Sequence, residues 1–364
     1  MKGFTTKAIH GIGPRKDPHG SLRVPVYDSV AFEHENAESL QSSFAGRKPA
    51  HVYSRITNPT VEDFEQKILL LSDGRAALAV SSGMAAISST LQRAIDSATC
   101  AVFLETVTNP QLEVADIATI SQITREQAVP LVVDNTLTTP YLFNSRDAGV
   151  DIELLSSTKY ISGGATSVGG VIIDNGTFDW RQSEKLAGKA RSYGAMAFIG
   201  SLRQEIYRNV GACLSPHNAY LQSLGLETMG LRIEKSCRNA MAVATFLQQH
   251  PKVRAVHYPG LEDSPFHETA TAQFGRRYGG LLTFDLQSKK DCFSLMNNLE
   301  IIRRATNVND NKTLILHPAS TIFAEYPEEE KVTMGIRPTT LRLSVGIEDQ
   351  DDLLDDLQRG LELL

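Results

Sequence analysis

The sequence is poor in features that define several classes of protein. Its 364 residues contain four cysteines, at positions 100, 213, 237 and 292, and none of them form a CxxC pair. That spacing argues against a disulfide framework and against a zinc site, so we expect no bound metal. No apolar run is long enough to span a membrane, and the first ten residues lack the apolar core of a secretory signal. We therefore expect a soluble, cytoplasmic protein with no membrane partner.

Concentrated basic charge, internal repeats and low-complexity tracts are also missing. The net charge is −6 and is spread along the chain, so nucleic acid is not an expected partner. A hydrophobic content of 41% and a charged content of 21% are typical of globular proteins. The length predicts two domains.

Strand and helix patterns alternate from about residue 61. Apolar strands are expected at 101–104, 130–133, 152–155 and 168–173, with helices at 61–71 and 84–91. This alternation predicts an α/β fold with a mostly parallel sheet covered by helices on both faces. A long helix over 218–249 leads into a smaller α+β domain with strands at 280–286, 313–316 and 340–345, and an amphipathic helix follows Asp349. Residues 1–50 are expected to form an arm that contacts a neighbouring subunit.

Two charged residues follow two of the predicted strands. Lys159 comes after the strand at 152–155, and Asp134 ends the strand at 130–133, 25 positions earlier. Ligands of open α/β sheets bind beyond the carboxyl ends of strands, and the spacing allows one crossover helix between parallel neighbours. A lysine and a carboxylate at this edge suit a pyridoxal cofactor, whose protonated ring nitrogen requires an acidic partner. Alternatively, Lys159 is a surface lysine and Asp134 a helix cap or turn residue.

Two further features point to anion binding. Ser82 and Gly83 open a predicted helix, where free backbone N–H groups and the helix dipole favour phosphate, although a plain helix start has the same pattern. Arg342 lies inside an otherwise apolar strand, and a buried guanidinium needs an anion. Its planar fork suits a substrate carboxylate, while a structural salt bridge is the alternative.

Seven motifs in order resemble those of the Cys/Met-metabolism, or trans-sulfuration, family of pyridoxal-phosphate (PLP) enzymes. The resemblance covers nearly the whole chain, and so many ordered motifs do not coincide by chance. The motifs are YSRITNPT at 53–60, SSGMAA at 81–86, ETVTNP at 105–110, VDNT at 133–136, SSTKY at 156–160, HPAST at 317–321 and RLSVGIED at 342–349.

The resemblance implies an aspartate-aminotransferase-like fold (PLP fold type I), with a PLP-binding domain at 51–237 and a C-terminal domain at 238–364. It implies a homotetramer built from two active dimers. Lys159 matches the lysine that holds PLP as a Schiff base, and Asp134 matches the partner of the ring nitrogen. The remaining matched positions are the phosphate ligands Gly83, Met84, Ser156 and Thr158, the pair Tyr53 and Arg55 that reaches the phosphate of the adjacent subunit, and the substrate-binding residues Arg342, Ser320 and Asn109.

Three local features are most similar to the O-acetylhomoserine sulfhydrylases of this family. They are FAGR at 44–47, GTFDW at 176–180, and AF at 197–198 shortly before LSPHNA at 214–219. The implied activity is γ-replacement on O-acetyl-L-homoserine by a sulfur nucleophile, giving homocysteine for methionine biosynthesis. The alternatives are a cystathionine γ-synthase and a methionine or cystathionine γ-lyase. The sequence does not distinguish an O-acetyl from an O-succinyl substrate. A protein of another class, a catalytically silent homologue with a binding role, also remains open. The sulfur donor is either free sulfide or the thiocarboxylate of a carrier protein.

One expected piece of the family pattern is missing. Only 26 positions separate Gly83 from Asn109, whereas the resemblance implies a longer insert that holds two strands, a helix and a tyrosine stacked on the cofactor ring. No tyrosine occurs between Tyr53 and Tyr141. A central sheet without two internal strands would expose unpaired backbone groups, so a deletion of this size should be unstable.

We therefore expect a further segment near Leu91 to Ser97 that the 364-residue sequence does not contain. Intact-mass spectrometry tests this: a mass several kilodaltons above 39.9 kDa supports the further segment. A mass equal to that of the 364 residues would reject the further segment. It would also favour the silent homologue, because the cofactor ring would lack its stacking tyrosine.

Overall fold

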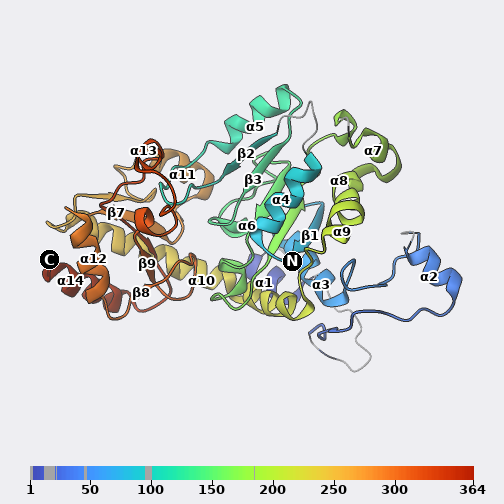
Figure 1. Ribbon diagram of the computed structural model, residues 1–364, viewed down its shortest axis with the longest axis horizontal. Helices are drawn as coiled ribbons and strands as arrows, with labels where there is room; N and C mark the ends of the chain where they lie inside the picture. The colour runs from blue at the N-terminus through green and yellow to red at the C-terminus, as the bar shows by residue number, and fades with distance from the viewer. Residues whose placement is uncertain (1–2, 12–20, 22, 45–46, 95–100, 184) are drawn as a thin grey trace.

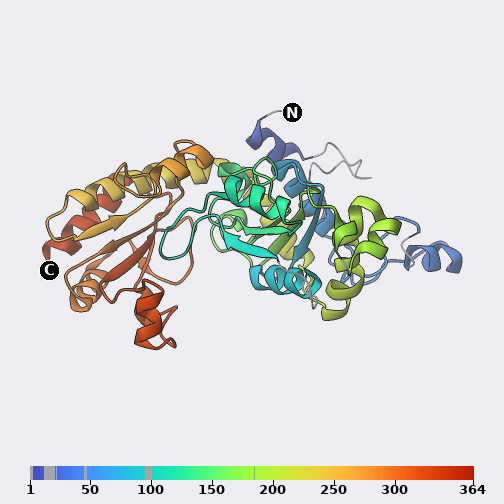
Figure 2. The same ribbon diagram turned by 90° about the horizontal axis from the view of Figure 1, so that it is seen from above.

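The computed structural model describes residues 3–11, 21, 23–44, 47–94, 101–183 and 185–364. The chain forms two lobes, each built on its own five-stranded sheet, and one long helix reaches from one lobe into the other (Figures 1 and 2). In the described part of the chain, no helix combines the length and the apolarity that a membrane span requires.

The sheet of the first lobe carries the strand ends on which the site prediction depends. Its order is β1-β5-β4-β3-β2, with β2, β3 and β4 parallel and β5 antiparallel to both of its neighbours. Every strand except β5 therefore runs in the same direction, and the predicted mostly parallel sheet is confirmed. The strands are β1 (Ala76–Val80), β2 (Val102–Glu105), β3 (Leu131–Asp134), β4 (Ile152–Leu155) and β5 (Gly170–Asp174), of which β1 was not predicted.

Helices cover both faces of this sheet and bury β1, β3, β4 and β5, whereas the edge strand β2 is partly exposed. Along β1, Leu78 packs with one apolar cluster, together with Trp180 and Phe198, while Ala77 and Ala79 face the cluster on the other side. The surrounding helices are α3 (Pro59–Ser72), α4 (Gly83–Ala94), α5 (Ile117–Glu126), α6 (Thr139–Leu142), α7 (Ala187–Tyr193), α8 (Ala197–Ser201) and α9 (Arg208–Val210), with short 3-10 or π turns at Tyr160–Ser162, Trp180–Gln182, Gly194–Met196 and Leu202–Tyr207.

Helix ends follow their local sequence. The side chain of Asn58 accepts a hydrogen bond from the N–H of Thr60, and Pro59 takes the first helical position of α3. Asp116 caps α5 in the same way through the N–H of Thr119.

The predicted crossover helix between β3 and β4 is shorter than expected. In this connection α6 is the only helix and has four residues, so turns make most of the connection.

The expectation that the two strands of the missing insert lie inside the central sheet is wrong, whereas the further segment itself stays a prediction. The five strands form a continuous order with hydrogen-bonded neighbours throughout, and in the described residues β2 is an edge strand rather than the neighbour of a gap. No internal strand is therefore missing from the described sheet. The instability expected from a gap between internal strands does not follow. Leu91 to Ala94 form the end of α4, and residues 95–97 of the stretch in question lie outside the described residues.

The second lobe holds the predicted C-terminal strands. Its sheet has the order β6-β7-β10-β9-β8 and is antiparallel apart from the β8–β9 pair. Leu353, Leu357 and Leu361 are buried along the last helix, as its amphipathic pattern predicted. The elements are β6 (Ala255–His257), α11 (His267–Phe274), β7 (Leu281–Asp285), α12 (Lys289–Asn298), β8 (Arg303–Arg304), β9 (Leu314–Leu316), a 3-10 turn at Pro318–Ser320, α13 (Glu328–Thr333), β10 (Thr340–Ser344) and α14 (Gln350–Glu362).

Helix α10 (Pro216–Gln249) joins the lobes and runs without interruption through Gly225 and Gly230. Ser215 caps it by accepting from the N–H of Asn218. Its buried residues up to Cys237 pack with the core of the first lobe, and those from Ala240 onward pack with the core of the second lobe.

The N-terminal segment is more structured than a simple arm. Helix α1 (Phe4–His10) packs on its own lobe, where Ala8 is buried and the ring of Phe4 meets the edge of Tyr141 at 4.8 Å between centroids. Helix α2 (Ala37–Phe44) stands away from the rest of the lobe (Figure 1). Residues 12–20 lie outside the described residues, and the contact of the segment with a neighbouring subunit stays a prediction.

Candidate active site

The carboxyl ends of three parallel strands open into one cavity, which we call the Lys159 cavity. Glu105 ends β2 and Asp134 ends β3, and the parallel register sets these two residues side by side. The cavity has a volume of about 340 Å³ and lies where parallel sheets ordinarily bind ligands. It is lined by Ser82, Gly83, Met84, Ile87, Glu105, Val107, Asn109, Asp134, Thr136, Leu137, Ser156, Thr158, Lys159 and Val308.

Lys159 enters the cavity from the turn after β4. Its backbone N–H donates to the carbonyl of Ser156 at 3.1 Å, and its Nζ donates to Oδ1 of Asn307 at 2.7 Å. Burial, together with the positive charge of Arg342, lowers the pKa of Lys159 below its usual value. A lowered pKa favours the neutral amine, which is the form that attacks a carbonyl carbon and accepts a proton.

Asp134 lies deep in the same cavity. Its Oδ1 accepts from the N–H of Thr136 at 2.9 Å. Burial raises the pKa of Asp134, and the hydrogen bonds from Thr136 only partly oppose that shift. Among the described residues no cationic side chain lies within ion-pair distance of this carboxylate. A buried carboxylate without a cation is costly, so the position suits a positively charged ligand group.

The start of α4 contributes backbone donors to the cavity. The Oγ of Ser82 accepts from the N–H of Ala85 at 3.0 Å, and in the described residues the N–H groups of Gly83 and Met84 have no acceptor. A Cβ on Gly83 would lie 2.8 Å from the Cβ of Ser156, so only glycine lets the helix start approach the end of β4 this closely. Free N–H groups at the start of a helix bind phosphate.

Ser156 and Thr158 lie across from this helix start. The backbone N–H of Ser156 donates to Oγ1 of Thr136 at 2.8 Å, and its own hydroxyl has no partner among the described residues. The hydroxyl of Thr158 accepts from the N–H of Gly169 at 3.0 Å. Gly83, Met84, Ser156 and Thr158 therefore surround one part of the cavity with hydroxyl and N–H donors, which is the chemistry of a phosphate site.

Arg342 is buried without an anionic partner. Its side chain is 3% exposed, and it donates to Oδ1 of Asn109 and to the carbonyl of Thr306, both at 2.9 Å. Its Nε is buried and has no acceptor, and no described carboxylate forms an ion pair with it. Burial lowers the pKa of Arg342 to about 10. The geometry therefore lacks the structural salt bridge that was the alternative, and leaves a guanidinium able to receive a carboxylate.

Besides Arg342, three more of the predicted residues do not line this cavity. Tyr53 and Arg55 lie near each other, with the guanidinium of Arg55 5.3 Å from the ring centroid of Tyr53, and Arg55 also donates to the carbonyl of Arg208. The hydroxyl of Ser320 pairs with Nδ1 of His317 at 2.7 Å. The roles expected for these three residues stay predictions.

Two polar residues at the site were not predicted: Glu105, which lines the cavity, and Asn307, which contacts Lys159. Glu105 accepts from the N–H of Asn109 at 3.2 Å, and the surrounding protein together with the charge of Asp134 raises the pKa of Glu105 to about 7. The strand-end argument that selected Asp134 applies equally to Glu105, so this residue could have been found. Asn307 belongs to a loop of the second lobe, and no local pattern in the sequence marks it.

The cavity also lacks an aromatic ring among its described lining residues. Its apolar surface comes from Met84, Ile87, Val107, Leu137 and Val308 instead. A planar ligand held by Lys159 and Asp134 would therefore contact aliphatic side chains where the family resemblance implies a stacked tyrosine.

Comparison with known proteins shows which protein family the chain around this cavity matches. Residues 5–93 and 88–362 match the family described as Cys/Met metabolism PLP-dependent enzyme. The match is divided into two segments that meet at residues 88–93, which is the position of the missing insert.

Curated relatives cover almost the whole chain. An L-methionine gamma-lyase of Fusobacterium nucleatum subsp. polymorphum is 34% identical over 408 aligned positions, covering 99% of this chain and 98% of the relative. An O-acetyl-L-homoserine sulfhydrylase of Corynebacterium glutamicum is 33% identical, covering 98% of this chain and 96% of the relative. Because 408 positions exceed the 364 residues of this chain, relatives carry residues that this sequence lacks.

Solved structures agree with this assignment. A putative O-acetylhomoserine (thiol)-lyase of Campylobacter jejuni that holds N'-pyridoxyl-lysine-5'-monophosphate is 30% identical, with a TM-score of 0.91 and coverage of 99% of this chain and 100% of that chain. An O-acetylhomoserine sulfhydrylase of Wolinella succinogenes is 43% identical, with a TM-score of 0.75 and coverage of 85% of this chain and 99% of that chain. The fold expected from the sequence, PLP fold type I, is confirmed.

The residues of the Lys159 cavity fit PLP. Lys159 would hold its aldehyde carbon, the uncompensated carboxylate of Asp134 would face its ring nitrogen, and the donors around Gly83 and Ser156 would hold its phosphate. The aldehyde, the ring nitrogen and the phosphate of the cofactor thus each have a matching group in the described cavity. When bound, PLP serves as an electron sink for carbanion chemistry at an amino acid.

We expect Asp134→Asn to retain the cofactor but to lose most of the activity, because a neutral amide cannot keep the ring nitrogen protonated. Asp134→Ala should also weaken cofactor binding, since the cation would lose its only polar partner at this position. Cofactor content by absorbance and kcat by steady-state assay separate the two effects. A kcat of the Asn variant equal to that of the wild type would give Asp134 a structural role instead.

Proposed function

Because the chain belongs to the Cys/Met metabolism family of PLP-dependent enzymes, we propose that it is a transferase that replaces the acetoxy group of O-acetyl-L-homoserine with a sulfur nucleophile. The product is homocysteine, and the process belongs to methionine biosynthesis. The observation that supports this choice within the family is the 43% identity to the sulfhydrylase of Wolinella succinogenes over 85% of this chain. Over nearly the whole chain, a sulfhydrylase and a methionine gamma-lyase are equally similar, at 33% and 34% identity.

Several residues of the chain have separate roles in this reaction. Arg342 binds the α-carboxylate of the substrate, with Asn109 orienting its guanidinium through the 2.9 Å hydrogen bond. That contact would place the α-carbon within reach of Lys159, whose lowered pKa favours the neutral amine that can accept the α-proton. Lys159 then returns a proton when the γ-carbon has exchanged acetate for sulfur. Ser320 is proposed to assist at the carboxylate.

Asn307 has a part in positioning Lys159. Its Oδ1 accepts from Nζ at 2.7 Å, and its Nδ2 donates to Asp310 at 3.0 Å, which fixes the orientation of the amide. The loop that carries Asn307 also gives its backbone carbonyls to Arg342. One loop of the second lobe therefore holds the base and the carboxylate-binding residue in register.

A second candidate function is γ-elimination by a lyase, which the relationship to methionine gamma-lyases favours. The two activities share every step up to the loss of the γ-substituent and differ in whether a nucleophile arrives. A catalytically silent homologue is the candidate from another class, and the lack of an aromatic ring around the Lys159 cavity in the described residues is the observation that favours it.

Incubation with O-acetyl-L-homoserine, with and without sulfide, tests these alternatives. A sulfhydrylase forms homocysteine only when sulfide is present, whereas a lyase forms 2-oxobutanoate and ammonia without it. A cystathionine γ-synthase would require cysteine in place of sulfide. Turnover of none of these mixtures by a preparation with a full complement of PLP would support the silent homologue.

The sulfur donor is a separate question. The Wolinella succinogenes sulfhydrylase is described with a novel mechanism of sulfur transfer, so the donor of this chain deserves a direct comparison. We propose that a sulfur-carrier protein bearing a C-terminal thiocarboxylate is a candidate partner beside free sulfide. A preference of at least tenfold in kcat/KM for either donor at equal concentration would assign it, since tenfold corresponds to ~1.4 kcal/mol.

We propose a cytoplasmic homotetramer of two active dimers, in which Tyr53 and Arg55 act on the phosphate of the adjacent subunit. Mixing Lys159→Ala subunits with Arg55→Ala subunits should then restore activity, because each hybrid dimer regains one intact site. Random mixing predicts about a quarter of the wild-type specific activity. An absence of recovery after verified subunit exchange would assign Arg55 to the site of its own subunit.

A further inference from the structure

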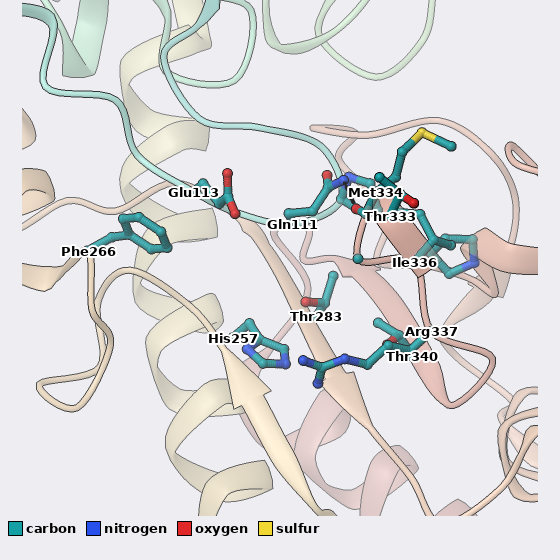
Figure 3. Close-up of a pocket in the computed structure, with 13 residues that line it drawn as sticks. Gln111, Glu113, His257, Phe266, Thr283, Thr333, Met334, Ile336, Arg337 and Thr340 are labelled. Atoms are coloured by element: carbon teal, nitrogen blue, oxygen red, sulfur yellow. Dashed lines mark hydrogen bonds between the residues drawn. The ribbon is translucent and has the colours of Figure 1, made fainter. Parts of the chain in front are cut away.

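A second cavity lies beside the Lys159 cavity and shares none of its lining residues. It has a volume of about 330 Å³ and sits between the loop after β2 and the sheet of the second lobe (Figure 3). The linings of the two cavities meet in the chain where Asn109 lines the first and Pro110 lines the second. Thr340 of the second cavity also stands two residues before Arg342, which donates to Asn109.

The floor of this second cavity is a row of side chains across the sheet of the second lobe. His257 on β6 pairs with Thr283 on β7, and Thr283 pairs with Arg342 on β10. Directly paired residues share a face of an antiparallel sheet, so this row leads from the second cavity to the carboxylate-binding arginine. Thr283 is 2% exposed, and its hydroxyl, which Figure 3 shows at the centre of the cavity, has no hydrogen-bond partner among the described residues.

One end of the cavity can hold an anion. Arg337 donates to Oδ2 of Asp285 at 2.9 Å through one nitrogen only, so its remaining N–H groups have no partner in the described residues. His257 lies 3.4 Å from the same oxygen, and its ring is next to the Arg337 guanidinium in Figure 3. Burial raises the pKa of Asp285, but hydrogen bonds from His257, Thr340 and Arg337 outweigh it and lower that pKa overall. Asp285 therefore stays ionised and fixes the donors in place.

The opposite side of the cavity has the other sign of charge. Figure 3 shows Glu113 and Gln111 across from Arg337 and His257. Glu113 forms no ion pair with any described residue, and the amide of Gln111 is fixed by donation to the carbonyl of Met334 at 2.8 Å. A lone carboxylate at this side repels a dianion and favours a ligand that carries an ammonium group.

Much of the remaining lining is apolar. Phe266, Met334, Ile336, Pro110 and Pro318 line the cavity, together with Gly335 and the hydroxyl residues Thr333 and Thr340. A ligand matched to these walls has one carboxylate, one ammonium group and an uncharged aliphatic side chain. The size of the cavity, about 330 Å³, is at the lower end of the range for small-molecule sites and suits an amino acid.

We propose that this second cavity is a binding site for an apolar α-amino acid in its zwitterionic form, distinct from the reaction site and beyond the function proposed above. Its carboxylate pairs with Arg337 and Thr283, and its ammonium group pairs with Glu113. The 109–113 loop and the His257–Thr283–Arg342 row connect the two cavities, so an occupant changes the affinity of Arg342 for substrate. By linkage, substrate changes the affinity of the second site by the same factor.

The probe is L-norleucine. The protein is the holoenzyme after borohydride reduction of the bond between lysine and cofactor, because the reduced bond cannot exchange with the amine of the probe. Isothermal titration should show saturable binding to the wild type. Arg337→Ala and Glu113→Gln should each weaken it about tenfold or more, as loss of a charge-assisted contact predicts. Glu113→Gln preserves shape, so it remains informative if Arg337→Ala does not fold.

Arg181→Ala is the matched control, because Arg181 is an exposed arginine that pairs with Asp179 at 2.7 Å in the first lobe. Binding to this variant should equal that of the wild type. Three results would overturn the proposal. The first is no binding to the wild type at about 10 mM probe, a concentration well above the Kd of ordinary metabolite sites. The second is unchanged binding in Arg337→Ala and Glu113→Gln, and the third is loss of binding in Arg342→Ala alone, which would assign the probe to the reaction site. Because no turnover is measured, these outcomes do not depend on which reaction the enzyme performs.

Discussion

Replacing Lys159 with alanine should abolish both turnover and the visible absorbance of the lysine-bound cofactor, while the fold stays intact. Nζ is the only side-chain amine that lines the Lys159 cavity in the described residues, and it is the group proposed to bind the cofactor and to move the α-proton. Its hydrogen bond to Asn307 is its one polar side-chain contact, so few interactions are lost with it. Circular dichroism, an absorbance spectrum and an assay with O-acetyl-L-homoserine test the three expectations together.

Lys185→Ala is a suitable control for that experiment, because Lys185 is exposed and lines neither the Lys159 cavity nor the second cavity. The control should match the wild type in absorbance and rate. Turnover by Lys159→Ala at the wild-type rate would reject the assignment on which the proposed function depends.

Arg342→Lys should raise KM strongly and change kcat much less. A lysine can place one ammonium group near the substrate carboxylate, but it cannot also hold Asn109 and the carbonyl of Thr306 in the plane that the guanidinium defines. Loss of a buried, hydrogen-bonded charge pair costs about 2–5 kcal/mol. At ~1.4 kcal/mol per tenfold, this predicts a rise in KM of roughly 30-fold or more.

Steady-state kinetics over a wide substrate range, with melting temperature as the check on folding, provide the measurement. A KM within twofold of the wild type would mean that Arg342 serves to hold the loop that carries Thr306 and does not bind the substrate. Arg181→Lys, an exposed substitution of the same kind, shows how much KM varies without any contact to the cavity.

The parts of the site that could be predicted are those governed by short-range sequence. Asp134 and Lys159 each follow a recognisable buried strand, and the rule that parallel strands present their carboxyl ends on one edge brings both to one cavity. Arg342 was identifiable because a charge within an apolar strand demands a special environment. These inferences need only the strand, its direction and the chemistry of one side chain.

The parts that could not be predicted depend on contacts between distant segments. Asn307 reaches Lys159 from the other lobe, across 148 positions of sequence, and nothing in its neighbourhood indicates that partner. The strand β1 was missed because its five residues AALAV include three alanines, only one β-branched residue, Val80, and no aromatic residue. The prediction about internal strands was wrong because it assumed where the two missing strands lie in the sheet. The described strands pair with one another without a gap, and only the observed strand order shows this.

The continuity of α10 has a consequence for unfolding. Its 34 residues span about 51 Å at 1.5 Å per residue, and its buried face belongs to the first core up to Cys237 and to the second from Ala240. Neither lobe can lose its core without fraying a helix that the other lobe packs against. The free energy of one lobe is thereby coupled to that of the other through an element that has no flexible joint. Heating should melt both lobes in a single cooperative transition, rather than in the two steps that a linker-joined pair would give.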